Sequence, residues 1–202
     1  MKKYHKYIFN EKKRTFVGKF EEMYREEGFE CFDSWHQEDM RVLQNRICQI
    51  ILNSYNFNTI LDVGCGKGTF SHLLKKANNE VTGIDISETA IKIAKGKYPD
   101  ISFVCVDLNY DSYKELPFFQ KSYDLILFME VLSYLPNYEK ILEAFAKITK
   151  YCLVALFIPE NPIGFVKSRE AMLSAFQTQF TIIEDIHLVT HRKTILFGQS
   201  KS

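Results

Sequence analysis

From residue 59 onward, short β-rich runs alternate with segments long enough to form helices, and this alternation constrains the fold most strongly. Strands that alternate with helices predict a parallel sheet covered by helices on both faces. The first five runs follow that rule. The runs are "TILDV" (59–63), "EVTGID" (80–85), "SFVCVD" (102–107), "YDLILFM" (123–129), "CLVALFI" (152–158), "TIIEDI" (181–186) and "KTILFG" (193–198).

The segments between the runs have helical spacing of apolar residues. "FSHLLKKA" and "YEKILEAFAKIT" each place their apolar side chains on one face, and Ser87 is a plausible N-cap for "SETAIKIAKGKY". The last two strands are separated only by "HLVTHR" (187–192), which is too short for a crossover helix. They are therefore expected to form an antiparallel hairpin.

The amino-terminal quarter has a different pattern. Residues 12–27 are charged with sparse apolar positions, and residues 38–55 place Met40, Leu43, Ile47 and Ile50 at helical spacing. We expect two leading helices joined by the aromatic segment "GFECFDSWHQ". The expected organisation is a helical cap or lid over residues 1–56 and one compact domain over residues 57–202.

Composition narrows the class of protein. The chain has 202 residues, 46% apolar and 25% charged, with a net charge of +1. Near-neutral charge favours neither nucleic acid nor an anionic membrane as partner, although residues 1–14 carry six Lys or Arg against one Glu. That excess is interpreted as a solvated tail in preference to an anion site.

Cysteine and histidine usage bear on compartment and metals. The five cysteines are scattered without a CxxC pair, which is typical of reduced thiols. The amino terminus lacks an apolar signal region, and no stretch approaches the length of a membrane span, so a cytoplasmic protein is expected. The histidines have no ligand-like spacing, so no metal is assigned.

A glycine-rich loop follows the first run, in "ILDVGCGKGTF" (60–70). Gly64, Gly66 and Gly68 allow positive φ and close approach of a ligand to the backbone. A dinucleotide fingerprint would have a third glycine at position 69, where this chain has Thr69. The loop therefore argues against NAD and FAD, although an NAD-dependent oxidoreductase stays as an alternative.

Three carboxylates accompany the loop. Asp85 ends the second strand, where its oxygens can accept hydrogen bonds from both ribose hydroxyls of an adenosine, and Asp107 ends the third, near an adenine amino edge. Asp62 is poorly placed for a pyrophosphate and well placed for an ammonium group. Each acid alone could simply end a strand. Together they favour S-adenosylmethionine.

Four ordered motifs carry a family resemblance over roughly residues 57–199. "ILDVGCGKG", "VTGIDIS", "FVCVDLN" and "YDLILFMEVLSYL" resemble the first to fourth motifs of the class I S-adenosylmethionine-dependent methyltransferases. The resemblance implies a Rossmann-like three-layer α/β sandwich with a seven-stranded, mostly parallel sheet, and S-adenosylhomocysteine as a product. The implied cofactor-binding residues are Trp35, Asp62, Gly64, Cys65, Gly66, Asp85, Ile86, Asp107, Leu108 and Met129.

The fourth motif bears on the methyl acceptor. It lacks the Asn/Asp-Pro-Pro-Tyr/Phe element of enzymes that methylate bases or glutamine, so a small-molecule acceptor is favoured over a macromolecule. "EVLSYL" (130–135) resembles the nodulation-protein-S-like methyltransferases. That resemblance implies methylation of O or N on a sugar derivative or a surface-polysaccharide precursor, and the basic first residues leave room for an acidic acceptor such as a nucleotide sugar.

Catalytic candidates come from the lid and from the end of the fourth strand. Histidine is the side chain that most often serves as a general base, so His36 is the first candidate, followed by Glu130 and Tyr134. Trp35 is expected to cover the cofactor, although it could merely dock the leading helices on the sheet. Cys65 is interpreted as a small loop residue. A noncatalytic adenosyl-ligand-binding regulatory protein shares every cofactor feature and stays open, and the oligomeric state is not predicted.

Overall fold

The structure is a computed structural model that describes residues 5–30, 33–37, 39 and 41–202. The sequence-based expectations for Cys31 and Met40 fall outside these described residues.

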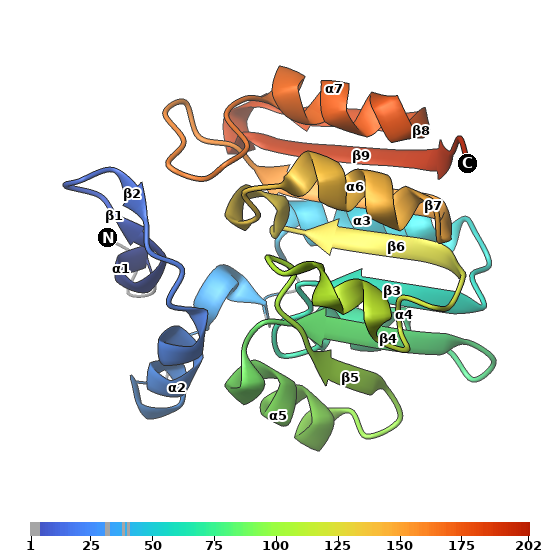
Figure 1. Cartoon of the computed structure of the whole chain (residues 1–202), viewed down its shortest axis with the longest axis horizontal. Helices are drawn as coiled ribbons and strands as arrows, with labels where there is room; N and C mark the ends of the chain where they lie inside the picture. Colours follow the sequence, from blue (N-terminus) through green and yellow to red (C-terminus); the bar gives the residue numbers. More distant parts are fainter. Residues whose placement is uncertain (1–4, 31–32, 38, 40) are drawn as a thin grey trace.

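A seven-stranded sheet forms the centre of the molecule, in the order β5-β4-β3-β6-β7-β9-β8 (Figure 1). Strands β3 to β7 run parallel, and β9 pairs antiparallel with both β7 and β8. The predicted carboxyl-terminal hairpin is thereby confirmed. The strands are β3 (Thr59–Val63), β4 (Glu80–Asp85), β5 (Ser102–Cys105), β6 (Tyr123–Met129), β7 (Thr149–Phe157), β8 (Phe180–Leu188) and β9 (Lys193–Ser200).

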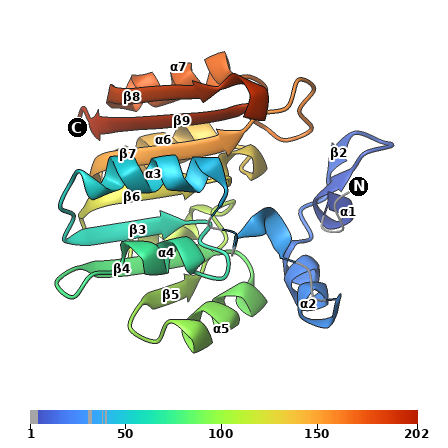
Figure 2. The same cartoon turned by 180° about the vertical axis from the view of Figure 1, so that it is seen from behind.

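Helices cover both faces of this sheet, as the two opposite views show (Figures 1 and 2). Residues of α3 (Leu43–Asn53), α4 (Thr69–Leu74) and α5 (Glu88–Lys97) share one apolar cluster with β3, β4 and β9. Residues of α6 (Tyr138–Ala146) and α7 (Arg169–Gln179) share the other cluster with β6 and β7. Two buried faces explain the long apolar runs of the central strands. The predicted α/β sandwich is confirmed.

Helix α7 lies in a stretch to which the sequence analysis assigned no helix. Its N-cap is Ser168, whose side chain accepts a hydrogen bond from the Ala171 backbone N–H at 3.1 Å. Met172 and Phe176 are its fully buried side chains. The apolar face is narrow, because most other positions of the helix are polar, and this hides the helical period.

Two leading helices are present, as expected, and α3 is the second of them, but the amino-terminal segment before α3 holds further elements. It contains α1 (His5–Ile8), a hairpin of β1 (Phe9–Asn10) and β2 (Thr15–Phe16), α2 (Phe20–Glu30) and the short 3-10 helix η1 (Ser34–His36). The expectation of a helix from residue 12 is wrong, because a turn with Arg14 at φ 50° joins the two short strands. Gly18 at φ 70° then separates the hairpin from α2.

The strand order predicts a ligand site at one edge of the sheet, the edge formed by the carboxyl ends of the parallel strands. From β3 the chain runs outward through β4 and β5, and it then crosses back to β6 on the other side of β3. In open α/β sheets, ligands bind at the carboxyl ends of the strands beside such a reversal. The amino-terminal segment faces this edge (Figure 1).

Candidate active site

The glycine loop leaves β3 at the point where strand order reverses. Gly64, Gly66 and Gly68 have φ values of 75°, 53° and 77°, a region that disfavours residues with a Cβ. A Cβ on Gly64 would lie 2.7 Å from Cγ2 of Val131. The loop therefore keeps its backbone in close contact with the segment that follows β6.

One cavity is lined by residues at the carboxyl ends of the strands and by residues of the amino-terminal segment. All of the predicted cofactor residues except Gly66 line it, as do the catalytic candidates Glu130 and Tyr134. Gly66 is buried beside this lining and is covered by Gln37. The full lining is Phe20, Tyr24, Trp35, Gln37, Asn45, Asp62, Gly64, Cys65, Phe70, Ile84, Asp85, Ile86, Val106, Asp107, Leu108, Asn109, Met129, Glu130, Val131, Tyr134 and Leu135.

Asp62 is the most deeply buried carboxylate of the cavity. Its side chain is 1% exposed, and Ser71 donates a hydrogen bond to its Oδ2 at 2.6 Å. Burial raises the pKa of Asp62 to about 6, and the hydrogen bond from Ser71 opposes that rise. A cationic group of a ligand would restore the charged form of this carboxylate.

Asp85 connects the end of β4 to the glycine loop. Its Oδ2 accepts a hydrogen bond from the backbone N–H of Gly66 at 2.9 Å, and its Oδ1 accepts one from the backbone N–H of Ser87 at 2.9 Å. Burial raises the pKa of Asp85, and these backbone donors partly oppose the rise. The carboxylate is oriented by the fold and lies in the cavity wall.

Asp107 follows β5 and is held by a local turn. The backbone N–H and the side-chain amide of Asn109 both donate to its Oδ1, at 2.9 and 2.7 Å. Ile86 and Leu108 stand beside these acids, and Ile86 is 39% exposed although apolar. An exposed apolar side chain between two carboxylates suits a flat heterocycle with polar edges.

Glu130 stands at the end of β6 in a strained backbone conformation, with φ 59°. Its Oε1 is paired with the ammonium of Lys193, and its Oε2 accepts a hydrogen bond from the Phe157 backbone N–H at 3.0 Å. Strain of this kind persists where the surroundings over-determine it and often marks a functional position. Lys193 was not singled out from the sequence.

Tyr134 is the centre of an aromatic cluster that joins the lid to the sheet. Its ring centroid lies 5.2 Å from that of Phe20, 5.5 Å from that of Trp35 and 6.0 Å from that of Phe16. These three partners belong to the amino-terminal segment. Trp35 therefore lines the cavity and packs against Tyr134, whereas its contact with a cofactor stays a prediction.

His36 stands apart from the cavity. Its side chain is exposed, and it is absent from the cavity lining. Both Trp35 and His36 have positive φ values, 60° and 53°, so the lid makes a strained turn here. Its role as a base stays a prediction, and Glu130 and Tyr134 are the candidates that reach the cavity.

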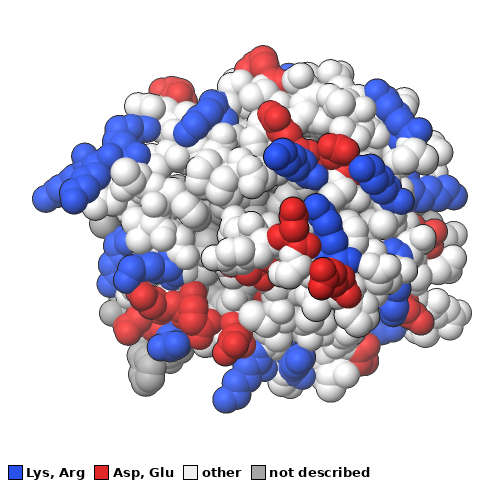
Figure 3. All heavy atoms as spheres, viewed as in Figure 1, with Lys and Arg blue, Asp and Glu red and all other residues white. Residues whose placement is uncertain are grey.

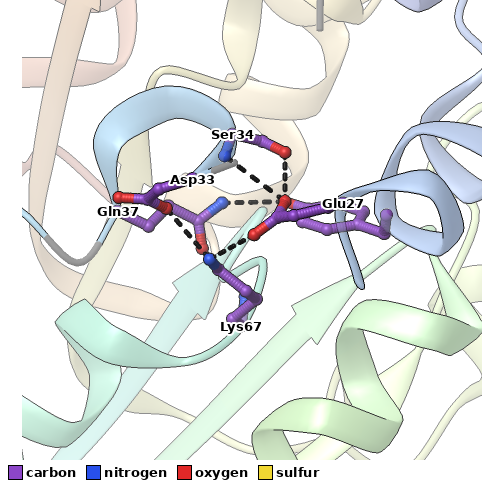
Figure 4. A network of polar contacts seen from close by, with 6 residues as sticks. Glu27, Asp33, Ser34, Gln37 and Lys67 are labelled. Atoms are coloured by element: carbon purple, nitrogen blue, oxygen red, sulfur yellow. Dashed lines mark hydrogen bonds and ion pairs between the residues drawn. The ribbon is translucent and has the colours of Figure 1, made fainter. Parts of the chain in front are cut away.

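The sequence analysis missed Gln37, Lys67 and Tyr24. Gln37 accepts a hydrogen bond from the Lys67 backbone N–H at 2.9 Å and donates one to the Tyr24 hydroxyl at 2.8 Å. The Lys67 ammonium turns away from the cavity toward the carboxylates of Glu27 and Asp33 (Figure 4). One signal in the sequence could have indicated these contacts, because Lys67 is a charged residue inside a glycine loop.

Three features of the described residues concern a thiol near the cavity, the binding of a metal ion and the crossing of a membrane. Burial raises the pKa of the Cys65 thiol well above its ordinary value, which agrees with a small neutral loop residue. Among the described residues, no group of three His, Cys, Asp or Glu side chains could hold a metal ion. None of the helices described has the length and apolarity to cross a bilayer.

The cavity fits an adenosyl amino-acid ligand by its donor and acceptor set. A buried carboxylate with a raised pKa precedes the glycines, two further acids end the neighbouring strands, and apolar side chains stand between them. The loop backbone has no room for a Cβ at Gly64. S-adenosylmethionine has the ammonium, ribose and adenine that these groups complement.

Comparisons with known proteins agree with this geometry. A family model described as "Methyltransferase domain" matches residues 60–151. A ubiquinone biosynthesis O-methyltransferase of Hydrogenovibrio crunogenus is 37% identical over 95 residues, which cover 46% of this chain and 38% of the relative. A demethylmenaquinone methyltransferase of Oceanobacillus iheyensis is 29% identical over 126 residues, 61% of this chain and 49% of the relative. The chain thus matches about half or less of the length of these relatives.

Solved structures share the whole fold. The N-methyltransferase NodS of Bradyrhizobium japonicum, crystallised with S-adenosylhomocysteine, aligns over 89% of this chain and 98% of its own. The TM-score is 0.70 at 18% identity. Residues 60–151 therefore match a methyltransferase-domain model, and the chain shares its fold with NodS, in agreement with the motif resemblance to the class I S-adenosylmethionine-dependent methyltransferases.

Proposed function

We propose that this protein transfers the methyl group of S-adenosylmethionine to an oxygen or nitrogen atom of a small molecule. The observation that carries the proposal is the convergence of Asp62, Asp85 and Asp107 with the glycine loop in one cavity. In this proposal residues 57–202 form the methyltransferase domain, and residues 1–56 form a cap over its site.

Each acid has a proposed contact. Asp62 binds the ammonium of the amino-acid arm, directly or through water. Asp85 accepts hydrogen bonds from the ribose hydroxyls while Gly66 holds its orientation, and Asp107 with its neighbouring backbone contacts the adenine edge. Ile86, Leu108 and Met129 pack against the adenosine. The cofactor, when bound, supplies an electrophilic methyl group on a sulfonium.

The side chains that line the cavity favour a methyl acceptor without negative charge. None of the described residues that line the cavity is Lys, Arg or His. Figure 3 shows Lys and Arg side chains spread over this face, with one group at the left edge, where Figure 1 places the β1–β2 hairpin; Lys12, Lys13 and Arg14 between its two strands are exposed. A phosphate buried in the cavity would have no counter-charge from these walls. We therefore favour a neutral hydroxyl or amine over the nucleotide sugar that the basic first residues had suggested.

Glu130 and Tyr134 are proposed to face the acceptor. Methyl transfer is an in-line displacement, so most of its acceleration can come from orientation and the exclusion of water. The aromatic residues Phe20, Trp35 and Tyr134 provide that exclusion, since they come together over the acceptor side of the cavity. Glu130, held by Lys193, would accept a hydrogen bond from the attacking group and help remove its proton.

A methyl-transfer assay with labelled S-adenosylmethionine tests the proposal. The acceptor panel contains phenols, neutral sugars, amino sugars and nucleotide sugars. Phenols are included because the names of two relatives refer to ubiquinone biosynthesis and to demethylmenaquinone. We expect transfer to a neutral hydroxyl or amine and none to the nucleotide sugars. Tight binding of S-adenosylmethionine without transfer to any acceptor would favour the noncatalytic adenosyl-ligand-binding protein instead.

A further inference from the structure

A buried cluster of three charges joins the lid to the glycine loop (Figure 4). The Lys67 ammonium pairs with Glu27 on α2 and lies 2.9 Å from Asp33, which precedes η1. The side chains of Lys67 and Glu27 are 6% and 9% exposed, and that of Asp33 is 28% exposed. Among the described residues of the cluster, the cation comes from the loop and the two carboxylates come from the lid.

The lid side of the cluster is internally braced. The backbone N–H of Ser34 donates to Oε2 of Glu27 at 3.3 Å, and the Ser34 hydroxyl donates to the same oxygen. Gln37 adds a neutral contact, since it accepts from the Lys67 backbone N–H and covers Gly66. A Cβ on Gly66 would lie 2.4 Å from the Gln37 amide. The lid therefore rests directly on the loop that holds Asp85 in place.

The contact between the lid and the loop depends on the charge of Lys67, because the lid contributes carboxylates and the loop contributes the ammonium. Burial alone would lower the pKa of Lys67, but the two carboxylates raise it above its ordinary value, so the ammonium stays charged. Without Lys67, Glu27 and Asp33 would lose this counter-charge at a buried surface, and removal of one partner of a buried ion pair is strongly destabilising. Because both carboxylates belong to a lid, displacement of the lid into water would relieve that cost.

We propose that Lys67 is a positioning residue that holds the amino-terminal lid closed over the glycine loop through Glu27 and Asp33. This inference rests on the proposed function for its consequence, because the lid carries Trp35 and Gln37 into the cavity wall. The charge cluster couples the position of these two side chains to the loop. Trp35 and Gln37 lie in the wall of the cavity that contains Asp62, so release of the lid would open this wall, and a weaker cluster would raise the rate at which the cofactor leaves.

Two other contacts hold the lid and provide an internal reference. Glu21 of α2 accepts hydrogen bonds from the Ser87 and Thr89 hydroxyls, both at 2.6 Å, at the start of α5. The aromatic cluster around Tyr134 holds the hairpin end. Neither contact involves Lys67, so a substitution of Lys67 removes neither of them directly.

Hydrogen exchange without cofactor tests the inference independently of methyl transfer. We compare the amides of α2 with those of β3, which serve as the control for global unfolding, in wild type, Lys67→Met and Asp33→Asn. We expect exchange in α2 to rise about tenfold or more in Lys67→Met, with β3 unchanged. Asp33→Asn keeps the Glu27–Lys67 pair, so it should change the exchange of α2 by less than about threefold.

The combined variant Glu27→Gln/Lys67→Met removes the Lys67 ammonium together with the Glu27 carboxylate that it pairs with. We expect it to recover at least half of the lost protection of α2 on a logarithmic scale. Equal α2 protection in wild type and Lys67→Met would overturn the inference. If β3 also loses protection, the test passes to Glu27→Gln on the lid side, for which unchanged α2 exchange is the contradicting result.

A second measurement ties the lid to the cofactor. The dissociation rate of S-adenosylmethionine, followed by rapid displacement with S-adenosylhomocysteine, should rise in Lys67→Met in parallel with α2 exchange. Wild-type protein that binds no cofactor would remove the proposed function while the exchange data still decide the role of Lys67. Bound cofactor with an unchanged dissociation rate would show that the lid does not gate the site.

Discussion

The carboxylate of Asp85 accepts a hydrogen bond from the backbone N–H of Gly66 at 2.9 Å. This contact links the end of β4 to the loop after β3 before any ligand binds. Since Ser87 occupies the other oxygen, Asp85 is held with both oxygens oriented by backbone N–H groups. An acid fixed in this way loses little conformational entropy when a ribose binds to it.

Asp62→Asn should stabilise the protein and weaken cofactor binding. The pKa of Asp62 is about 6 in the folded protein against 3.8 ordinarily, so its contribution to stability is fully present below pH 3.8 and is lost as pH rises through 6. That difference corresponds to roughly 3 kcal/mol at most. We expect the Asp62→Asn variant to gain about 2 kcal/mol over wild type at pH 8 and almost nothing at pH 4.

Denaturant unfolding at the two pH values measures this gain, and calorimetry measures the cofactor. Wild-type affinity for S-adenosylmethionine should fall as pH drops below 6, because protonated Asp62 cannot pair with an ammonium, and the variant should lose that dependence. A variant that is less stable than wild type at pH 8, or that keeps the pH dependence of binding, would contradict this role of Asp62.

Gly66→Ala should displace the lid at the glycine loop. Gly66 has φ 53°, and an added Cβ would meet the Gln37 amide at 2.4 Å. We expect a loss of about 1–2 kcal/mol of stability and weaker cofactor binding. Gly96→Ala is the matched control, since a Cβ there meets nothing within 4 Å on helix α5, and it should gain about 0.5–1 kcal/mol. Thermal unfolding compares the two, and equal effects would argue against close contact at Gly66.

Glu130→Gln should lower kcat more than His36→Ala does. Glu130 lines the cavity with a carboxylate fixed by Lys193 and Phe157, whereas His36 is exposed and lies outside the lining. Loss of a positioned general base typically costs about 10²–10⁴-fold in rate. Single-turnover kinetics at saturating cofactor make the comparison, and a larger loss for His36→Ala would identify His36 as the base.

The two substitutions Tyr134→Phe and Tyr134→Ala separate the ring from the hydroxyl. The ring packs against Phe16, Phe20 and Trp35 of the lid, so Tyr134→Ala should expose the lid and raise KM for the acceptor about tenfold or more. Tyr134→Phe keeps these contacts and should leave KM nearly unchanged. A large fall in kcat for Tyr134→Phe would show instead that the hydroxyl takes part in the reaction.

The sheet and the meeting of the three acids at one cavity could be predicted from the sequence because both follow from local patterns. The predicted runs at 59–63, 80–85 and 123–129 coincide with β3, β4 and β6. Asp62, Asp85 and Asp107 each lie near the end of a strand or follow one, and parallel strands bring such ends to one edge. The sequence distance between the acids therefore did not matter.

The contacts between the lid and the glycine loop could not be predicted in the same way. Lys67 meets Glu27 and Asp33 across 40 and 34 residues, and Gln37 meets Lys67 across 30. No periodic pattern records such contacts between a loop and an irregular segment. The short β1–β2 hairpin was missed for a related reason, because strands of two residues are too short to show alternation.

Titration of S-adenosylmethionine into wild type and Asp85→Ala by calorimetry tests the central claim most directly. Asp100→Ala, which removes an exposed carboxylate outside the cavity lining, is the control for the change in net charge. We expect wild type and the control to bind alike and Asp85→Ala to bind at least about tenfold more weakly, which corresponds to about 1.4 kcal/mol. Equal affinity in a folded Asp85→Ala protein would contradict the placement of the cofactor at this edge of the sheet.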